Sequence, residues 1–360
     1  MNISRRDFIR RLVALGFTAA TASALFSWLS CKPRQTGVST SMPPLPPETQ
    51  AQTFTPSTAA MTTAASPTGS TPAVLTQAPA QTTPSSPPLV SSGTYLAVAR
   101  GPSPKAMVEA AVRSLGGIEE FVKPGYDVII KPNICVAYHS YEYAATTNPE
   151  VVGTLVAMCK GAGAKRVRVM DQPFGGTVEQ AYAITGIGEA VRAAGGQMET
   201  MSQIKFRNTV IPDGIDIRSW PVYSDVLEAD AVINVPIAKH HSLARLTMGL
   251  KNVMGVVQNR NLLHLNLGQR VADLTSLVKP ELTVVDCVRI LMNNGPTGGN
   301  LNDVKLANTV IASRDVVAAD AYAATLFGLT GADIPAVRAG AQMGLGTMDL
   351  RGIRIEEINV

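Results

Sequence analysis

The sequence has 360 residues, of which 46% are hydrophobic and 16% charged, and it contains only four cysteines. This composition excludes a disulfide scaffold and a wholly disordered chain. Residues 1–92 hold six Lys or Arg and two Asp or Glu, whereas residues 93–360 hold twenty-five of each, so the excess charge of +4 lies in the N-terminal segment. A neutral folded part argues against nucleic acid as a partner, because binding phosphates needs a basic face.

Residues 1–31 have the anatomy of an export signal. Arg5 and Arg6 lie in a charged start that runs into an uncharged stretch, residues 12–30, rich in Ala, Leu and Thr. Paired arginines before such a stretch are typical of a twin-arginine signal peptide. This predicts export by the twin-arginine machinery to the periplasm or the outer face of the cytoplasmic membrane. The alternative is an uncleaved membrane anchor, since about 18 apolar residues can span a bilayer.

The end of the signal leaves two alternatives open. Cys31 stands where a lipoprotein carries its lipid, and lipidation there would anchor the protein to a membrane through acyl chains. Trp28 fits poorly before such a cysteine, and Ala22-Ser23-Ala24 offers an ordinary cleavage site instead.

The segment 32–92 changes composition abruptly. Residues 33–92 contain twelve Pro, thirteen Thr and nine Ser, and their only charges are Arg34 and Glu48. Such a segment cannot bury enough apolar surface to offset its conformational entropy. We therefore expect a disordered, semi-extended linker that holds the domain 93–360 away from a membrane or wall.

The domain 93–360 alternates apolar strands with amphipathic helices, which predicts an α/β fold. Ser103 and Asn148, each followed by Pro, are N-cap signals. Continuous apolar strands indicate mixed or mostly parallel sheets covered by helices on both faces, in one α/β lobe or two. We expect strands at residues 95–99, 126–130, 166–170, 231–236, 282–285 and 306–312, and helices at 104–122, 149–160, 265–278, 316–327 and 334–342.

Charged and amide side chains follow several of the predicted strands. In open α/β sheets ligands bind outside the carboxyl ends of the strands, and ammonium and amide groups complement oxyanions. Each residue alone has a plainer interpretation, because a strand-terminal Asp usually caps a helix and a lone Lys is usually solvated. Together they predict a site for a small anionic ligand. Its candidates are Lys131, Asn133, Asp171, Lys239, Lys251, Asn252, Asp286 and the Gly-rich loop at Gly295.

The histidines offer two further roles at this site. His240 and His241 would point in opposite directions on a strand, so both cannot ligate one ion from a regular strand. His241, His264 and Asp286 form a nitrogen and oxygen set acceptable to zinc, iron or nickel. Alternatively, His241, His264 or Lys239 moves a proton during catalysis and Asp286 orients the histidine. Which of the adjacent histidines faces the ligand stays open.

Several cofactor motifs are missing from the sequence. Cys135, Cys159 and Cys287 are isolated, so no iron–sulfur cluster or zinc ribbon is encoded, although Cys135 could be a reactive thiol. The sequence also has no G-x-G-x-x-G after a strand and no P-loop. Apart from the metal just considered, the cofactor stays unknown.

The same segments resemble the family known as domain of unknown function 362. The resemblance covers nearly all of residues 95–360. It is carried by IIKPN (129–133), ATTNP (145–149), INVPIAKHH (233–241), TMGLKNVMG (247–255), NGP (294–296) and ASRDVVAADA (312–321).

The resemblance implies a shared site and a redox context. Members often carry a ferredoxin-like iron–sulfur extension, which this chain lacks, and His240 stands where a small residue such as threonine is usual. The implied site residues are Lys131, Asn133, Lys239, His241, Lys251, Asn252, His264 and Asp286.

Three functions follow from these patterns. The first is an exported enzyme or redox accessory that acts on a small anionic ligand. The second is a tethered protein that binds an anion or a metal without chemistry. The third, a structural or partner-binding role, has no dedicated signature in the sequence.

Overall fold

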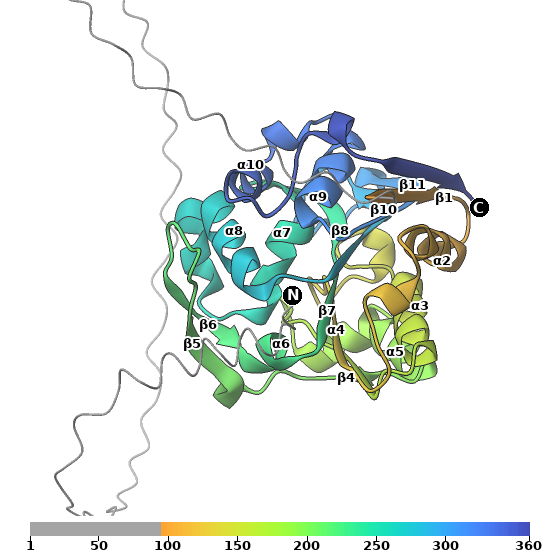
Figure 1. The fold of residues 1–360 in the computed structure, drawn as a ribbon, viewed down its shortest axis with the longest axis horizontal. Coiled ribbons are helices and arrows are strands. Elements are labelled where there is room, and N and C mark those ends of the chain that lie inside the picture. Colours follow the sequence, from red (N-terminus) through yellow and green to blue (C-terminus); the bar gives the residue numbers. More distant parts are fainter. Residues whose placement is uncertain (1–94) are drawn as a thin grey trace, which may run out of the picture. The chain divides into compact units, whose positions relative to one another are not determined.

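The structure, a computed structural model, describes residues 95–360 (Figure 1). The predicted export signal, the lipidation candidate Cys31 and the linker 32–92 lie outside the described residues. Among the helices of the described part, none is both long and apolar enough to cross a membrane.

A mixed, mostly parallel sheet runs through the described chain, in the order β12-β1-β11-β10-β7-β2-β3-β4. Strands β10, β7, β2, β3 and β4 are parallel neighbours, whereas β11 is antiparallel to β1 and β10. Strand β8 pairs with β10 and β9, and β5 and β6 form a separate two-stranded sheet. The strands are β1 (Leu96–Arg100), β2 (Asp127–Pro132), β3 (Arg166–Val169), β4 (Gln197–Met198), β5 (Phe206–Val210), β6 (Ser219–Tyr223), β7 (Ala231–Val235), β8 (Ile237–His241), β9 (Arg245–Thr247), β10 (Leu282–Leu291), β11 (Val304–Ser313) and β12 (Ile355–Asn359).

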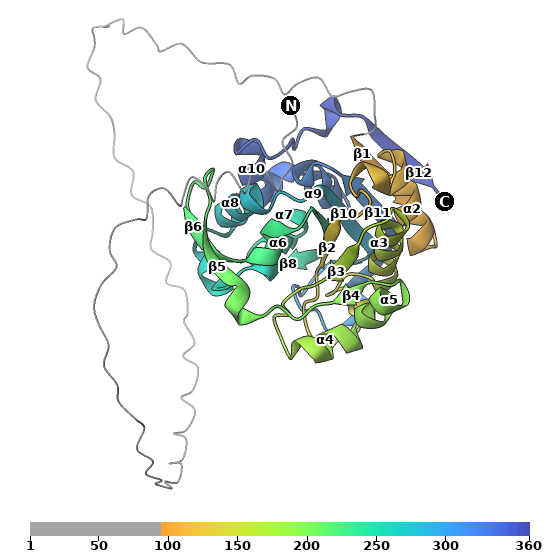
Figure 2. The ribbon, with the colours of Figure 1, turned by 60° about the horizontal axis from the view of Figure 1, so that its bottom comes forward.

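Helices cover both faces of this sheet, which confirms the predicted α/β class (Figures 1 and 2). Helices α2, α3, α4 and α5 pack on one face, and α6 to α10 pack on the other. The second lobe that the sequence left open is not formed in the described chain, where one sheet joins the two helical layers. The helices are α2 (Pro104–Ser114), α3 (Pro149–Gly161), α4 (Val178–Ile184), α5 (Ile187–Ala193), α6 (Ser224–Glu228), α7 (Gly249–Asn252), α8 (Leu267–Val278), α9 (Val316–Thr325) and α10 (Pro335–Gln342).

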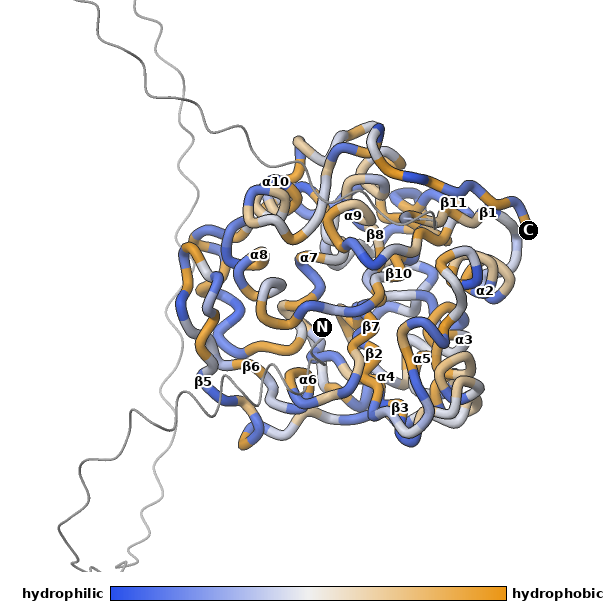
Figure 3. The backbone as a smooth tube through the Cα atoms, viewed as in Figure 1, coloured by the Kyte–Doolittle hydropathy of each residue, from blue (hydrophilic) through white to orange (hydrophobic). Residues whose placement is uncertain are grey.

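Strand residues alternate between the two hydrophobic cores, as the pleat of a strand requires. On β10, Val284 and Val288 lie in the core under α2 and α3, whereas Val285 and Cys287 lie in the core under α8 and α9. The central strands β2 and β7 are accordingly coloured as apolar in Figure 3. Burial on both faces explains why these strands read as continuous apolar runs.

Local signals placed the starts of α2 and α3 correctly, whereas α4, α5, α6 and α7 were not predicted. The Ser103 side chain accepts a hydrogen bond from the Ala106 amide, and Asn148 accepts one from the Glu150 amide, so both act as N-caps. The predicted helix 104–122 is too long: α2 ends at Ser114, followed by a short 3-10 helix. Gly116 has φ +101°, a left-handed backbone that ends the helix at little steric cost.

Candidate functional site

The carboxyl ends of adjacent parallel strands meet at one edge of the sheet. Strand β2 brings Lys131 to this edge, and Asp171 follows the end of its neighbour β3. On the other side of β2, strand β7 brings Asn234, and the chain continues into β8 with Lys239. Parallel pairing therefore gathers side chains that are up to about a hundred residues apart.

Lys131 is fully paired at the centre of this edge. Its Nζ forms an ion pair with Asp171 Oδ1 at 2.9 Å and donates to Asn252 Oδ1 at 3.0 Å and to the Pro132 carbonyl at 2.6 Å. Both partners of the ion pair are buried. Burial lowers the pKa of Lys131, and nearby Arg260 lowers it further, while Asp171 opposes the shift. With three acceptors around it, this ammonium group is a structural element of the site.

An amide relay fixes α7 to the sheet beside Lys131. The Nδ2 of Asn252 donates to the Lys131 carbonyl at 3.0 Å and to Asn234 Oδ1 at 2.8 Å. Asn234 in turn donates from Nδ2 to the Gly249 carbonyl at 3.0 Å. Because Gly249 and Asn252 are the two ends of α7, the relay sets the position of this helix and of Lys251 on it.

Lys239 joins the same network from β8. Its Nζ donates to Asn133 Oδ1 at 3.0 Å and to the Ala145 carbonyl at 2.6 Å, and the side chain is buried. The Nδ2 of Asn133 donates to Asn252 Oδ1 at 3.3 Å. The structure thus brings together four of the residues predicted from the strand ends, namely Lys131, Asn133, Lys239 and Asn252.

Lys251 differs from the other lysines of the site. Its side-chain amine makes no hydrogen bond or ion pair with another residue of the described chain, and its side chain is only partly exposed. Burial is the largest cause that lowers its pKa to about 8, and the charges of Lys239, Arg260 and Lys131 add to the effect, while Cys135 opposes it. Lys251 is therefore an amine in a strongly cationic environment that is available to a ligand.

His241, not His240, shares the face of β8 that carries Lys239. Its Nδ1 accepts hydrogen bonds from the backbone amides of Leu243 and Ala244, at 3.1 and 3.3 Å. Burial lowers the pKa of His241 to about 3, with further effects from Lys251 and Lys239. The ring is therefore neutral at pH 7, and this hydrogen-bond pattern assigns its proton to Nε2. His241 is a fixed neutral donor.

His240 and Gly295 contact each other and hold the Gly295 loop against β8. The Gly295 amide donates to His240 Nδ1 at 3.1 Å. A Cβ at Gly295 would lie 1.8 Å from the His240 carbonyl oxygen, so only glycine allows this approach of loop and strand. The structure gives Gly295, predicted as a ligand-binding residue, this packing role. The next residue, Pro296, accepts a weak hydrogen bond from Cys135 Sγ at 3.6 Å, which places the loop beside the site.

Asp286 does not orient a histidine, in contrast to the expectation from the sequence. Its Oδ2 accepts from the Asn148 amide at 2.7 Å and its Oδ1 from the Val288 amide at 2.9 Å. The carboxyl group is buried, and burial raises its pKa to about 6. β10 continues to Leu291, so Asp286 lies in mid-strand and not at a strand end. Its hydrogen bond with the Asn148 amide connects β10 to the start of α3.

The predicted metal ligands are not assembled. Within residues 95–360, no group of three or more His, Cys, Asp or Glu side chains is placed to hold a metal ion. His264 is exposed, and its Nδ1 lies 3.2 Å from the Asn261 carbonyl. The Nε2 of His241 carries its proton, so it offers no lone pair, and Asp286 faces backbone amides. The donor set of His241, His264 and Asp286 does not fit a metal ion.

Arg260 is a site cation that the sequence did not reveal. Its guanidinium donates to the carbonyls of Gln172 and Pro173, at 2.8 and 3.1 Å, directly after Asp171. It lies in a 3-10 helix, Arg260–Asn266, that has no periodic pattern to predict its direction. Asp171, by contrast, follows a predicted strand, but only the structure shows that it pairs with Lys131.

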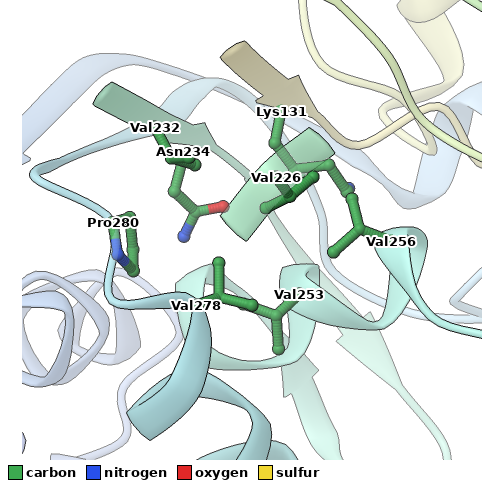
Figure 4. Close-up of a pocket in the computed structure, with 8 residues that line it drawn as sticks. All are labelled: Lys131, Val226, Val232, Asn234, Val253, Val256, Val278 and Pro280. Atoms are coloured by element: carbon green, nitrogen blue, oxygen red, sulfur yellow. The ribbon is translucent and has the colours of Figure 1, made fainter. Parts of the chain in front are cut away.

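A small pocket lies beneath the network, on the side of the valines (Figure 4). Lys131 and Asn234 are the only polar residues that line it among the described residues. Lys131 is already paired with Asp171 and Asn252, and Asn234 with Asn252 and the Gly249 carbonyl. It is too apolar for an anion. Its lining residues are Lys131, Val226, Val232, Asn234, Val253, Val256, Val278 and Pro280.

Comparison with known proteins places this site in a family. The family model described as "Domain of unknown function (DUF362)" matches residues 128–325, more than half of the chain. The chain belongs to the DUF362 family. The matched segment of this DUF362 protein includes every residue of the site from Lys131 to Gly295.

A relative and a solved structure are also similar to this DUF362 protein. "Thylakoid-associated protein sll1697" of Synechocystis sp. (strain ATCC 27184 / PCC 6803 / Kazusa) is 27% identical over 250 residues, which cover 67% of this chain and 75% of the relative. The lactate racemase apoprotein from Thermoanaerobacterium thermosaccharolyticum has a TM-score of 0.38 and 10% identity over 62% of this chain. The chain spans about half, 55%, of that racemase. A likeness at this level gives no information about a shared reaction.

Proposed function

We propose that this DUF362 protein binds a small anionic ligand at the carboxyl edge of its sheet and is an enzyme that acts on it. The observation that carries this proposal is an excess of positive charge at this edge of the sheet. Asp171 neutralises Lys131, but the buried Lys239 and the partly exposed Lys251 and Arg260 form no ion pair with a carboxylate of the described chain. Cations that are withdrawn from water without a counter-ion are costly, and an anion would neutralise them.

The donors at the site favour a carboxylate or a similar oxyanion. Lys251 has three N–H donors without a partner in the described chain, and Lys239 has one N–H beyond its two hydrogen bonds. His241 adds a neutral Nε2–H donor next to them. Hydrogen bonds from ammonium groups to oxyanions are short and strong, so these groups suit a doubly charged ligand such as a dicarboxylate.

Loss of the Lys251 amine should weaken anion binding. We expect oxalate and sulfate to raise the melting temperature of the full chain, and Lys251→Ala to lower oxalate affinity about tenfold to a hundredfold, since a charged hydrogen bond contributes about 1.5–3 kcal/mol. Thermal shift titrations measure this. Lys165→Ala, at an exposed position, is the matched control and should bind oxalate like the unchanged chain. An unchanged affinity in Lys251→Ala, or no anion effect at all, contradicts the proposal.

The same titration has a pH signature. Only the protonated amine of Lys251 attracts an anion, and the pKa of this group is about 8. Oxalate affinity should therefore be highest below pH 7 and fall as the pH rises through 8, by about tenfold at pH 9 if the neutral amine does not bind. Lys251→Arg keeps its charge over this range, so its affinity should not change with pH. A flat curve for the unchanged chain would exclude a role for Lys251.

Binding without chemistry is the competing function. Saturable binding of an anion with no conversion of any bound compound would favour a tethered binding protein. The leader is compatible with such a tether in either case, because its paired arginines predict export and Cys31 stands where a lipoprotein would carry its lipid. The name of the thylakoid-associated relative fits a position at a membrane surface.

Export by the twin-arginine route is part of the proposal. Replacing Arg5 and Arg6 by Lys should leave most of the protein in the cytoplasm, because the paired arginines are the recognised part of such a signal. Cell fractionation followed by immunoblotting measures the distribution. Equal export of the double variant would show that another route is used.

A further inference from the structure

The three lysines of the site differ in the state of their amines. Lys131 Nζ is surrounded by three acceptors, and Lys239 Nζ donates to two oxygens while being buried. Lys251 alone among these three has no partner in the described chain and is partly exposed. A nucleophilic amine must be able to lose its proton and must be open to approach, and of the three only the Lys251 amine is neither held by acceptors nor buried.

The surroundings of Lys251 favour its neutral form. Burial is the largest cause, and the charges of Lys239 on β8, Arg260 on the 3-10 helix and Lys131 on β2 act in the same direction, whereas Cys135 in the loop after β2 opposes them. His241 lies near the same amine. With a pKa of about 8, about 10% of this amine is neutral at pH 7, against less than about 0.1% for an ordinary lysine. Desolvation and neighbouring cations are the general means of making a lysine nucleophilic.

The cationic character of the site limits which electrophile the amine can meet. Lys239 and Arg260 have no carboxylate partner in the described chain, so they suit the carboxylate of a ligand. The Nε2–H of His241 suits a neutral acceptor such as a carbonyl oxygen. A compound with a carboxylate next to a ketone or aldehyde carries both groups in one small molecule.

We propose that Lys251 is a nucleophilic amine that forms an imine with a small 2-oxo acid bound at this edge of the sheet. The inference rests on the proposed function and names its substrate class. The neutral amine attacks the carbonyl carbon, a C–N bond forms, and the carbonyl oxygen takes up the proton that the nitrogen loses, which gives a neutral carbinolamine. The C–O bond then breaks, and the hydroxyl group leaves as water with a proton from solvent. The product is a protonated imine, and the step needs no oxidant or reductant.

Reductive trapping tests this inference on the full chain. The protein is incubated with pyruvate and sodium cyanoborohydride, and the modified lysines are identified by peptide mass mapping. We expect Lys251 to be modified at least about tenfold faster than the exposed Lys165, because far more of its amine is neutral at pH 7. Modification should rise with pH up to about 8 and then level off, whereas that of Lys165 should continue to rise. Equal modification of the two lysines would overturn the proposal.

Two further measurements distinguish imine formation at Lys251 from the binding of an anion without a covalent bond. Lys251→Arg keeps the charge but lacks a nucleophilic amine, so no adduct should form at this position while its melting temperature still rises in oxalate. Oxalate offers the same carboxylates without a ketone, so an excess should protect Lys251 of the unchanged chain from pyruvate. If oxalate binds but Lys251 is not trapped, the imine is excluded and the anion site stands. If neither oxalate nor pyruvate acts on the protein, the proposed function fails as well.

Discussion

Replacing Arg168 by Met is expected to lower the free energy of unfolding by about 3–5 kcal/mol, since it removes the buried cation of a charge cluster. Arg168 lies on β3 with 4% of its side chain exposed. Its guanidinium forms ion pairs with Asp127 at 2.8 Å, Glu199 at 2.9 Å and Asp225. The variant would leave three carboxylates clustered, with only the more exposed cations of Arg166 and Lys205 beside them. Urea denaturation monitored by circular dichroism measures the loss.

Arg166→Met is the matched control for this prediction. Arg166 also pairs with Asp127, but 49% of its side chain is exposed. A solvent-exposed ion pair contributes about 0–1 kcal/mol, so this variant should stay close to the unchanged chain. If Arg168→Met loses no more stability than Arg166→Met, then the buried cluster is not a stabilising element.

The acid side of the stability curve gives a second readout for Arg168. Burial alone would raise the pKa of Asp127, but hydrogen bonds from Arg166 and Arg168 outweigh it and lower the pKa in the folded state. A carboxyl group with a lowered folded pKa stabilises the protein above its unfolded pKa of about 4, and this contribution disappears as the pH falls. Unfolding of the unchanged chain should therefore become easier below about pH 5, and less steeply so in Arg168→Met.

The parts of the fold that follow from local rules could be predicted from the sequence. Ser103 and Asn148 marked helix starts, and apolar runs marked β1, β2, β3, β7 and β11. The short polar strand β8 could not be recognised, because its residues Lys239, His240 and His241 have no apolar periodicity. It forms because β10 and β9 supply its hydrogen bonds, which is tertiary information.

The sequence predicted those site residues that follow the carboxyl ends of parallel strands. Lys131 and Lys239 meet because the strands that carry or precede them are parallel neighbours. Asp286 was misjudged for the same reason: the predicted strand ended at residue 285, whereas β10 continues to Leu291 and its carboxylate meets backbone amides. The direction of Arg260 depends on the fold of an irregular segment, which no sequence pattern encodes.

The ion pair between Lys131 and Asp171 holds this edge of the sheet together, and its loss is the second large effect we expect. Lys131→Met leaves a buried carboxylate, and Asp171→Asn leaves a buried ammonium group next to the cation of Arg260. Each should lower the free energy of unfolding by about 3–5 kcal/mol. Gly255 packs so closely on the pair that a Cβ there would lie 1.8 Å from Asp171 Oδ1, so the structure has no space to rearrange around it.

A double-mutant cycle separates the pair from the packing of its two side chains. Lys131→Met combined with Asp171→Asn removes both charges at once, so the double variant should lose less stability than the two single losses added together, by about 1–3 kcal/mol. Urea denaturation of the four proteins gives this coupling energy. Strictly additive losses would show that the two charges do not stabilise each other. The site would then owe its geometry to the amide relay of Asn234 and Asn252, and the cationic edge would be neutralised by a ligand alone.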